Sequence, residues 1–263
     1  MPVTLDQIVA EARREIASTK AVTSRADLER RAAEHTPRGF AAALRRAAGA
    51  GPAVIAELKR ASPSRGVIRG SFHVASLATQ LAEAGAAALS VLTNEPFFQG
   101  SLPNLCEASA AAELPCLRKD FLLDEFQMLE TRANGGDAAL LIVAALSEAE
   151  LRRLQAAARE FGLDVLCEVH DESELGRALD LGFDVIGVNN RDLRTFEVDL
   201  GTALRMAAKI PAGVLKVAES GIESGQDIRR LRDAGYEAFL IGESLMKAEW
   251  PGEALKQLLA ASF

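Results

Sequence analysis

The sequence is poor in the residues that build disulfide frameworks and metal sites. Its three cysteines are Cys106, Cys116 and Cys167, and none of them forms a C-x-x-C pair. Because their number is odd and their spacing irregular, we expect no disulfide framework, and a reducing cytosol fits better. The three histidines are scattered without the spacing of metal ligands, so we expect no metal.

Long apolar runs and isolated basic clusters are missing as well. No apolar stretch approaches the roughly 20 residues that cross a bilayer, and residues 1–18 are acidic as well as basic, unlike a signal peptide. The net charge is −7, and no group of Lys and Arg stands free of Asp and Glu. These absences exclude membrane proteins and disfavour nucleic acid as a partner, whereas a small anionic ligand needs only a few local donors.

The sequence does contain enough apolar residues for one large hydrophobic core. The chain has 263 residues, 49% of them hydrophobic, and a single barrel domain over residues 1–263 fits, since such barrels need about 250 residues. Apolar residues recur at helical spacing from 5 to 16, and further helices are predicted over 24–36 and 40–48. Residues 1–50 are therefore predicted to form an N-terminal helical extension.

After this extension, short apolar runs alternate with longer amphipathic segments. The eight runs are AVIAEL (53–58), AALSVL (87–92), CLRKDF (116–121), AALLIV (138–143), DVLCEV (164–169), DVIGVN (184–189), VLKVAE (214–219) and AFLIGE (238–243). Three of the intervening segments begin with a cap pair and end at glycine: Ser147 and Glu150 before Gly162, Asp171 and Glu174 before Gly182, and Ser224 and Asp227 before Gly235.

This alternation predicts an α/β fold, a parallel sheet covered by helices. Eight such units favour a closed (β/α)8 TIM barrel. The alternative is a doubly wound open sheet, but the first strand is not followed by the Gly-rich turn that binds dinucleotides in such sheets.

Polar residues stand at the ends of five of the eight predicted strands. They are Glu57, Lys59, Lys119, Glu168, Asn189 and Glu219. Active sites of (β/α)8 barrels lie at the C-terminal ends of the strands, so these side chains are predicted to converge on one mouth as catalytic groups. For any one of them, a structural ion pair at the rim is the simpler interpretation. Cys167 and Lys216 have the opposite parity and are predicted to face the helices.

Two segments after the last two strands have the features of phosphate cradles. Residues 219–222 (Glu-Ser-Gly-Ile) and 241–245 (Ile-Gly-Glu-Ser-Leu) place glycine where barrels bind phosphate through backbone N–H groups. The loop 60–66 is basic and rich in turn residues, so it either covers an anion or is an ordinary surface turn. Phe98 and Phe121 follow strands two and three and either line a flat apolar pocket or seal the barrel top.

These segments resemble one known family in chain order. The segments are Ile55–Ser64 (IAELKRASPS), Leu92–Ser101 (LTNEPFFQGS), Arg118–Phe121 (RKDF), Gly187–Leu193 (GVNNRDL), Ala218–Ile222 (AESGI) and Leu240–Met246 (LIGESLM). Together they are similar to the signatures of indole-3-glycerol-phosphate synthases, from strand one to strand eight. The helical N-terminal extension is also typical of that family.

The resemblance implies a substrate, 1-(o-carboxyphenylamino)-1-deoxyribulose 5-phosphate, and a product, indole-3-glycerol phosphate, formed in tryptophan biosynthesis with loss of CO₂ and water. It implies no cofactor and no metal. We expect a cytoplasmic enzyme that acts on a small sugar phosphate as a monomer or weak homo-oligomer. Lys119 would protonate the ketone oxygen during ring closure, and Glu57, Lys59 and Glu168 would share the later proton transfers.

The resemblance also implies three groups of binding residues. Asn189, Glu219 and Arg191 would hold the sugar hydroxyls and orient the catalytic groups. Contacts to the phosphate would come from Ser62, Ser220, Gly221, Gly242 and Glu243, the last through its backbone with its side chain pointing away. The anthranilate ring would pack against Phe98, Phe121 and Leu193.

Two rival functions are disfavoured by the same residues. A phosphoribosylanthranilate isomerase typically uses a Cys and an Asp at strand ends, whereas strand one here ends in Glu57-Leu-Lys59. A catalytically silent sugar-phosphate sensor would keep the phosphate loops and lose the acid–base groups, which this chain retains.

Overall fold

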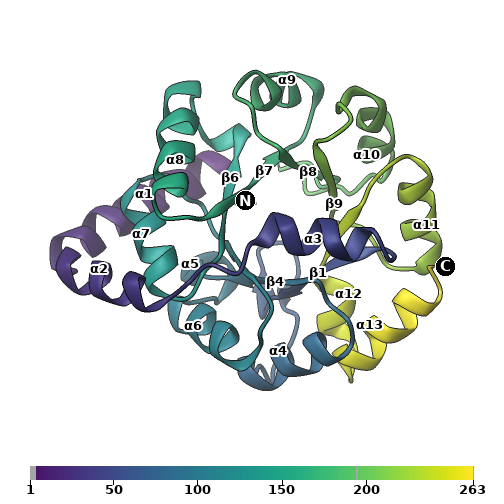
Figure 1. The fold of residues 1–263 in the computed structure, drawn as a ribbon, viewed down its shortest axis with the longest axis horizontal. Coiled ribbons are helices and arrows are strands. Elements are labelled where there is room, and N and C mark those ends of the chain that lie inside the picture. Colours follow the sequence, from purple (N-terminus) through teal and green to yellow (C-terminus); the bar gives the residue numbers. More distant parts are fainter. Residues whose placement is uncertain (1–3, 194, 263) are drawn as a thin grey trace.

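A closed barrel of eight parallel strands forms the centre of the computed structural model, which describes residues 4–193 and 195–262 (Figure 1). The barrel strands are β1 (Ala53–Leu58), β4 (Ala88–Leu92), β5 (Cys116–Lys119), β6 (Ala138–Ile142), β7 (Asp164–Val169), β8 (Val185–Asn189), β9 (Leu215–Glu219) and β10 (Ala238–Ile241). Their spatial order is β1-β10-β9-β8-β7-β6-β5-β4, and β1 closes the barrel by pairing with both β4 and β10. The predicted (β/α)8 barrel is confirmed, and the open sheet is excluded.

The strands match the eight predicted apolar runs, but β5 and β10 each end two residues before their run does. Strand β5 ends at Lys119, as predicted, and Phe121 lies beyond it. The carboxylate of Asp120 accepts hydrogen bonds from the backbone N–H of Phe121 at 2.9 Å and from Thr93 Oγ1 at 2.6 Å. These side-chain bonds turn the backbone out of the ladder and direct the next residues over the barrel mouth.

Helices follow each strand and cover the outside of the barrel. They are α4 (Val74–Glu83), α5 (Glu95–Phe98), α6 (Leu102–Ala111), α7 (Phe126–Ala133), α8 (Glu148–Glu160), α9 (Glu172–Asp180), α10 (Gly201–Met206), α11 (Gly225–Asp233), α12 (Glu243–Lys247) and α13 (Pro251–Ala260). A small hairpin, β2 (Ala61–Ser62) and β3 (Gly66–Val67), follows β1. Short 3-10 turns span Val143–Ala145 and Ala207–Lys209.

The helix boundaries largely follow the predicted caps. Ser147 opens α8 and Ser224 opens α11, each in a reciprocal capping box. At α9 only half of the predicted box is present, since Asp171 caps the N–H of Glu174 but the Glu174 carboxylate turns to His170 instead.

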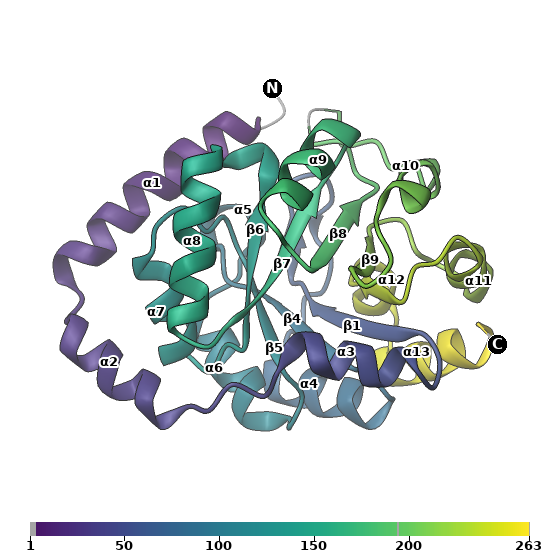
Figure 2. The same cartoon turned by 45° about the horizontal axis from the view of Figure 1, so that its top comes forward.

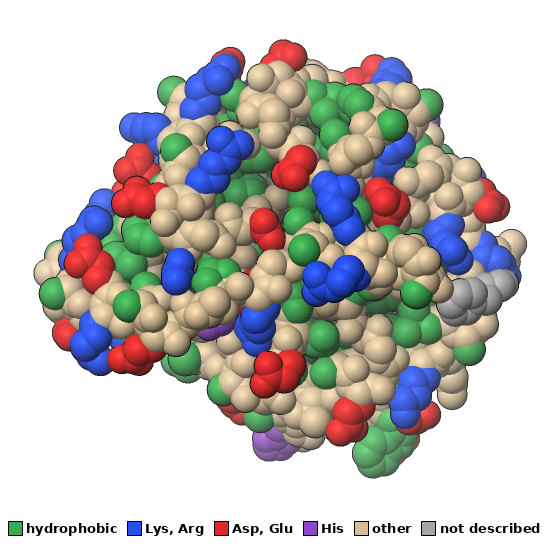
Figure 3. Space-filling view, in the orientation of Figure 1, with side chains coloured by type: hydrophobic (Ala, Val, Ile, Leu, Met, Phe, Trp, Pro, Cys, Tyr) green, Lys and Arg blue, Asp and Glu red, His purple; other side chains and the backbone are tan. Residues whose placement is uncertain are grey.

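Three helices precede the barrel, as predicted: α1 (Leu5–Val22), which runs six residues beyond the expected spacing, α2 (Arg25–Glu34) and α3 (Phe40–Ala48). In Figure 2, α1 passes beside α8, and Arg13 pairs with Glu150 in the first turn of α8 at 2.8 Å. Helix α3 crosses the end of the barrel at which the strands begin (Figure 1). There, the N–H of Ala41 donates to Asp164 at the start of β7. Acidic and basic side chains are interspersed over the face that α3 crosses (Figure 3).

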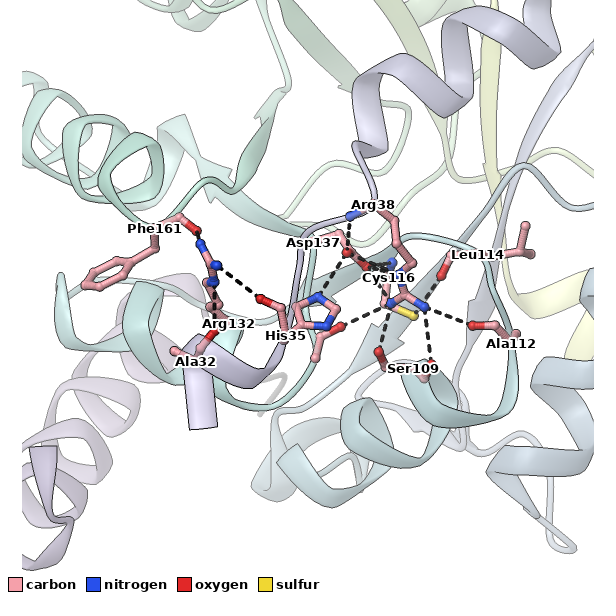
Figure 4. A network of polar contacts seen from close by, with 11 residues as sticks. Ala32, His35, Arg38, Ser109, Ala112, Leu114, Cys116, Arg132, Asp137 and Phe161 are labelled. Carbon is pink, nitrogen blue, oxygen red and sulfur yellow. Dashed lines mark hydrogen bonds and ion pairs between the residues drawn. The ribbon is translucent and has the colours of Figure 1, made fainter. Parts of the chain in front are cut away.

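The segment between α2 and α3 is anchored by a buried carboxylate, Asp137 (Figure 4). Its oxygens accept from the Arg38 guanidinium at 2.6 Å, from His35 at 3.1 Å and from the backbone N–H of Cys116 at 2.6 Å. Burial alone would raise the pKa of Asp137, but the hydrogen bonds from His35 and Arg38 outweigh it and lower the pKa. The N-terminal extension is therefore tied to the bottom of the barrel.

Candidate active site

All six polar residues predicted at the strand ends line one cavity of about 250 Å³ at the C-terminal end of the barrel. We call Glu57, Lys59, Lys119, Glu168, Asn189 and Glu219 the polar ring. Their strands pair in parallel, so their C-terminal ends lie at the same end of the barrel. Because inward-facing positions alternate along each strand, residues far apart in sequence meet above the packed core.

Lys119 is at the centre of the polar ring. Its Nζ donates to Glu168 Oε2 at 2.7 Å and to Glu219 Oε2 at 2.8 Å, and all three side chains are largely buried. Burial alone would lower the pKa of the Lys119 ammonium, but attraction by Glu168, Glu219 and Glu57 outweighs it and raises the pKa. The amine is therefore held protonated at neutral pH, as a proton donor must be.

The two carboxylates beside Lys119 differ in their environment. Burial raises the pKa of Glu168, but Lys119 and His170 outweigh it and lower the pKa, so this group is ionised. At Glu219 burial also raises the pKa, and repulsion by ionised Glu168 adds to it, so the pKa of Glu219 lies above its ordinary value despite Lys119. Two carboxyl groups with pKa values pushed apart are typical of acid–base sites.

The second cation of the ring is Lys59. Its Nζ donates to Glu57 Oε1 at 2.6 Å, and both side chains extend from the end of β1 toward the cavity. Asn189 donates through Nδ2 to Glu168 Oε1 at 3.1 Å and accepts at Oδ1 from the N–H of Arg191 at 3.0 Å. Asn189 thus connects a ring carboxylate to the loop after β8.

Two glycines make room for ring carboxylates. A Cβ on Gly242 would lie 2.5 Å from Glu57 Oε1, and a Cβ on Gly187 would lie 2.1 Å from Glu219 Oε1. Both contacts are far inside van der Waals distance, so only glycine allows these carboxylates their positions. The geometry of the polar ring therefore depends on glycines of neighbouring strands and turns as well as on its own residues.

The turn after β9 has the form expected of an anion cradle. Ser220 has φ +65° and Gly221 has φ +75°, so two successive residues adopt left-handed backbone. Asn190 holds this turn, because its Nδ2 donates to the carbonyls of Glu219 at 3.0 Å and Ser220 at 3.1 Å. Ser244 links the turn to the next one by donating to the carbonyl of Ile222 at 3.2 Å. Both glycine turns, with Gly221 and Gly242, line the cavity.

Glu243, the first residue of α12, also lines the cavity. Its carboxylate contacts Lys247 at 2.6 Å, Arg65 of the β2–β3 hairpin at 3.2 Å and Arg191 at 3.6 Å. Burial raises the pKa of Glu243, but the hydrogen bond and charge of Lys247 outweigh it and lower the pKa. Three cations therefore surround this carboxylate beside the two glycine turns.

The remaining predicted binding residues lie on the same cavity wall. Ser62, Phe98, Phe121, Arg191 and Leu193 all line it. Leu140 and Ile142 of β6, which has no polar residue at its end, add apolar surface. The cavity lining thus combines apolar side chains with the charged groups of the polar ring.

Several residues at the site were not identified from the sequence. Leu5 and Ile8 of α1 line the cavity, although they lie far from every strand end in the chain. His170 contacts Glu168 at 3.3 Å. The sequence could have indicated this contact, because His170 lies one residue beyond the strand and has the same parity as Glu168. Cys167 is fully buried, and Lys216 reaches outward to donate to the carbonyl of Ala207 at the end of α10, 2.9 Å away, where a helix terminus favours a cation.

Comparison with known proteins identifies the family. The model of the family described as indole-3-glycerol phosphate synthase matches residues 5–258. The chain belongs to the indole-3-glycerol phosphate synthase family. The indole-3-glycerol phosphate synthase of Koribacter versatilis is 60% identical over 98% of this chain and 100% of that protein. The one from Bordetella pertussis is 49% identical over 97% of this chain and 98% of that protein. The family predicted from the motifs is confirmed.

Solved structures show the same barrel in more distant proteins. A 3-hexulose-6-phosphate synthase aligns with a TM-score of 0.63 and 18% identity, covering 80% of this chain and 99% of that one. A thiamine phosphate pyrophosphorylase from Pyrococcus furiosus aligns with a TM-score of 0.59 and 14% identity, covering 80% and 95%. At this identity the likeness concerns the fold alone.

Metal-binding groups and membrane-spanning helices are both absent from the described part of the chain. It contains no group of three or more His, Cys, Asp and Glu side chains placed to hold a metal ion. None of the helices in residues 4–193 and 195–262 combines the length and apolar character needed to cross a membrane.

Proposed function

We propose that the polar ring converts 1-(o-carboxyphenylamino)-1-deoxyribulose 5-phosphate to indole-3-glycerol phosphate, CO₂ and water. The class of activity, a carboxy-lyase of tryptophan biosynthesis, follows from membership of the family. The observation that carries the assignment to this cavity is the placement of Lys119 between two buried carboxylates, in the same cavity as two glycine turns.

Substrate binding is proposed to use both ends of the cavity. The backbone N–H groups of Gly221 and of Gly242–Glu243 would bind the phosphate, because N–H groups in the first turn of a helix have no intrahelical acceptor. Arg65 and Arg191 would add positive charge there, and Ser62 and Ser220 would add hydroxyl donors. The anthranilate ring would pack against Phe98, Phe121 and Leu193, which places its carboxylate toward Lys59 and the ketone toward Lys119.

Ring closure is the first chemical step. The aryl carbon that bears the carboxylate attacks the ketone carbon, and Lys119 gives its proton to the ketone oxygen, which becomes a hydroxyl. Positive charge develops on the anilino nitrogen, and the ionised carboxylate of Glu168, together with Glu57, stabilises it. The carbon–carboxylate bond then breaks, CO₂ leaves and the benzene ring is aromatic again.

Dehydration completes the pyrrole ring. The new hydroxyl leaves as water after accepting a proton, and a base removes a proton so that the double bond forms. Glu57, Lys59 and Glu168 are the groups proposed for these transfers, since they face the same volume as Lys119. Asn189, Glu219 and Arg191 would hold the sugar hydroxyls and keep the reacting atoms oriented.

The proposed function is tested by supplying the purified protein with the anilino-sugar phosphate. Indole fluorescence should rise, with CO₂ released in equal amount. The same substrate without its phosphate serves as the control, and its KM should be much higher because the glycine turns then have no anion to bind. Absence of fluorescence with folded protein at saturating phosphorylated substrate would contradict the proposal.

We further propose a cytoplasmic location, a monomer or weak homo-oligomer, and one domain over residues 1–263. The three cysteines are free, which supports a reducing compartment. One hydrophobic core includes Ile8 of α1 and Leu255 of α13, which supports a single domain.

A further inference from the structure

We infer that His170 is a positioning residue for Glu168, which it holds with the Oε2 atom of the carboxylate toward Lys119. This inference rests on the role proposed above for Glu168. His170 directly follows β7, and its side chain is 12% exposed beside the 3% exposed side chain of Glu168.

Both nitrogens of the His170 ring face carboxylates. Nδ1 lies 3.0 Å from Glu174 Oε2, and Nε2 lies 3.3 Å from Glu168 Oε1. The backbone N–H of His170 also donates to Glu174 Oε2 at 2.8 Å, so the ring is fixed from the side of α9. A neutral imidazole has only one N–H, so a ring placed between two carboxylates is the doubly protonated form.

The electrostatics agree with this geometry. Burial alone would lower the pKa of His170, but Glu168 and Glu174 outweigh it and raise the pKa to about 10. The polar ring has three carboxylates, Glu57, Glu168 and Glu219, and two cations, Lys59 and Lys119. His170 supplies a third positive charge next to these groups, which reduces the cost of keeping Glu168 ionised in a buried position.

The two oxygens of Glu168 are divided between different partners. Oε1 contacts Asn189 at 3.1 Å and His170 at 3.3 Å, whereas Oε2 contacts Lys119 at 2.7 Å. Nε2 of His170 is buried and forms no aligned hydrogen bond within the described residues, so it attracts Glu168 as a charge. This attraction favours one orientation of the carboxylate, and an error of about 1 Å at a reacting group can cost a factor of 10² in rate.

A purely structural role for His170 would depend on the other ring nitrogen, Nδ1. In that case its contact with Glu174 would tie the end of β7 to α9, and the contact with Glu168 would be incidental. Two replacements separate these roles, because the amide of asparagine reaches the position of Nδ1 and the longer amide of glutamine reaches the position of Nε2.

The test compares His170→Asn with His170→Gln in steady-state kinetics. We expect His170→Asn to lower kcat about 10- to 100-fold with little change in KM, because Glu168 loses the attraction of His170 while the contacts to the phosphate and the anthranilate ring remain. His170→Gln should recover part of this loss, because its neutral amide lacks the positive charge but can donate a hydrogen bond to Glu168 Oε1. His73→Asn is the matched control, because His73 is exposed at the start of α4, and it should behave as wild type.

A double variant shows whether His170 acts through Glu168. In the Glu168→Gln background, His170→Asn should lower kcat no further, because the interaction is already lost. Unchanged kcat in His170→Asn, an equal loss in His170→Gln, or losses that multiply in the double variant would each overturn the inference. Wild-type kcat in Glu168→Gln alone would instead remove the proposed role of Glu168, and that variant leaves His170 intact. Thermal unfolding of each variant accompanies the kinetics, and equal losses of Tm and kcat in both replacements also count against positioning.

Discussion

Lys119 is held between Glu168 and Glu219 at 2.7 and 2.8 Å, so its replacement changes both the proton supply and the charge balance. Lys119→Gln keeps size and hydrogen bonding but removes the transferable proton. We expect kcat to fall by about 10²–10⁴, the usual contribution of a general acid, with KM changed much less. Steady-state kinetics on the anilino-sugar phosphate measures both.

Two further variants separate proton transfer by Lys119 from the effect of its charge and from the role of Lys59. Lys119→Arg keeps the positive charge beside the carboxylates but does not release a proton near neutral pH, so it should lose kcat as well. Lys59→Gln should raise KM too, because Lys59 faces the substrate carboxylate. If chemistry is rate-limiting and Lys119→Gln stays within roughly tenfold of wild type, Lys119 is not the acid and Lys59 becomes the candidate.

A substitution at Gly242 tests whether one added methyl group disturbs the geometry of the polar ring. Gly242→Ala would place a methyl group 2.5 Å from Glu57 Oε1 and 2.9 Å from Glu57 Cβ, so the glutamate must move. We expect kcat to fall by about 10- to 100-fold, the cost of displacing a reacting group by about an ångström. Gly70→Ala is the control, since a Cβ there meets no atom within 4 Å among the described residues, and it should keep full activity. Equal activity of the two variants would show that Glu57 is not constrained by Gly242.

Helix α9 is the element that carries Glu174 and hence the contact to His170, and its two glycines respond oppositely to the same substitution. Gly176 lies inside the helix and Gly182 lies just beyond it with φ +73°, and a Cβ at either position meets no described atom within 4 Å. Gly176→Ala should raise the free energy of unfolding by about 0.5–1 kcal/mol, because alanine loses less backbone entropy in a helix. Gly182→Ala should lower it by about 1–2 kcal/mol, because a side chain is strained in left-handed backbone. Urea unfolding measures both, and a change of the same sign in the two variants would refute the backbone explanation.

At the scale of the whole molecule, Asp137 joins the N-terminal extension to the start of the barrel (Figure 4). Its side chain is fully buried and pairs with Arg38 at 2.6 Å. Asp137→Asn removes one charge of this pair, and breaking a buried pair on one side costs about 3–5 kcal/mol of unfolding free energy. Asp233→Asn, at the exposed end of α11, is the control and should stay within about 0.5 kcal/mol of wild type.

The same carboxylate predicts how stability depends on pH. Because folding lowers the pKa of Asp137, its contribution is complete above the ordinary aspartate value of about 3.9. It is lost as pH falls through the lowered pKa of the folded state, where the carboxylate becomes protonated. The stability difference between wild type and Asp137→Asn should therefore be constant near neutral pH and shrink in acid. A difference that grows below pH of about 4 would show that Asp137 is not the group responsible.

The sequence alone determined the fold and the strand-end residues, because both depend on local periodicity. Apolar runs, cap pairs and closing glycines define eight βα units, and parity along each strand selects the side chains that face inward. Glu57, Lys119, Glu168 and Glu219 could thus be assigned to one barrel mouth without coordinates. Family motifs then supplied the chemistry that such a mouth is expected to perform.

Only the tertiary structure decided the interactions between chain segments that are distant in sequence. Leu5 and Ile8 reach the cavity because α1 packs along the barrel, which no strand pattern indicates. Lys119 is paired with Glu168 and Glu219 across 49 and 100 residues, and the sign of its pKa shift depends on the balance of burial and charge there. Even over four residues the cap pattern was not sufficient, since the Glu174 carboxylate contacts His170 and not the start of its own helix. Periodicity specifies which way a side chain points, whereas distances between strands specify what it meets.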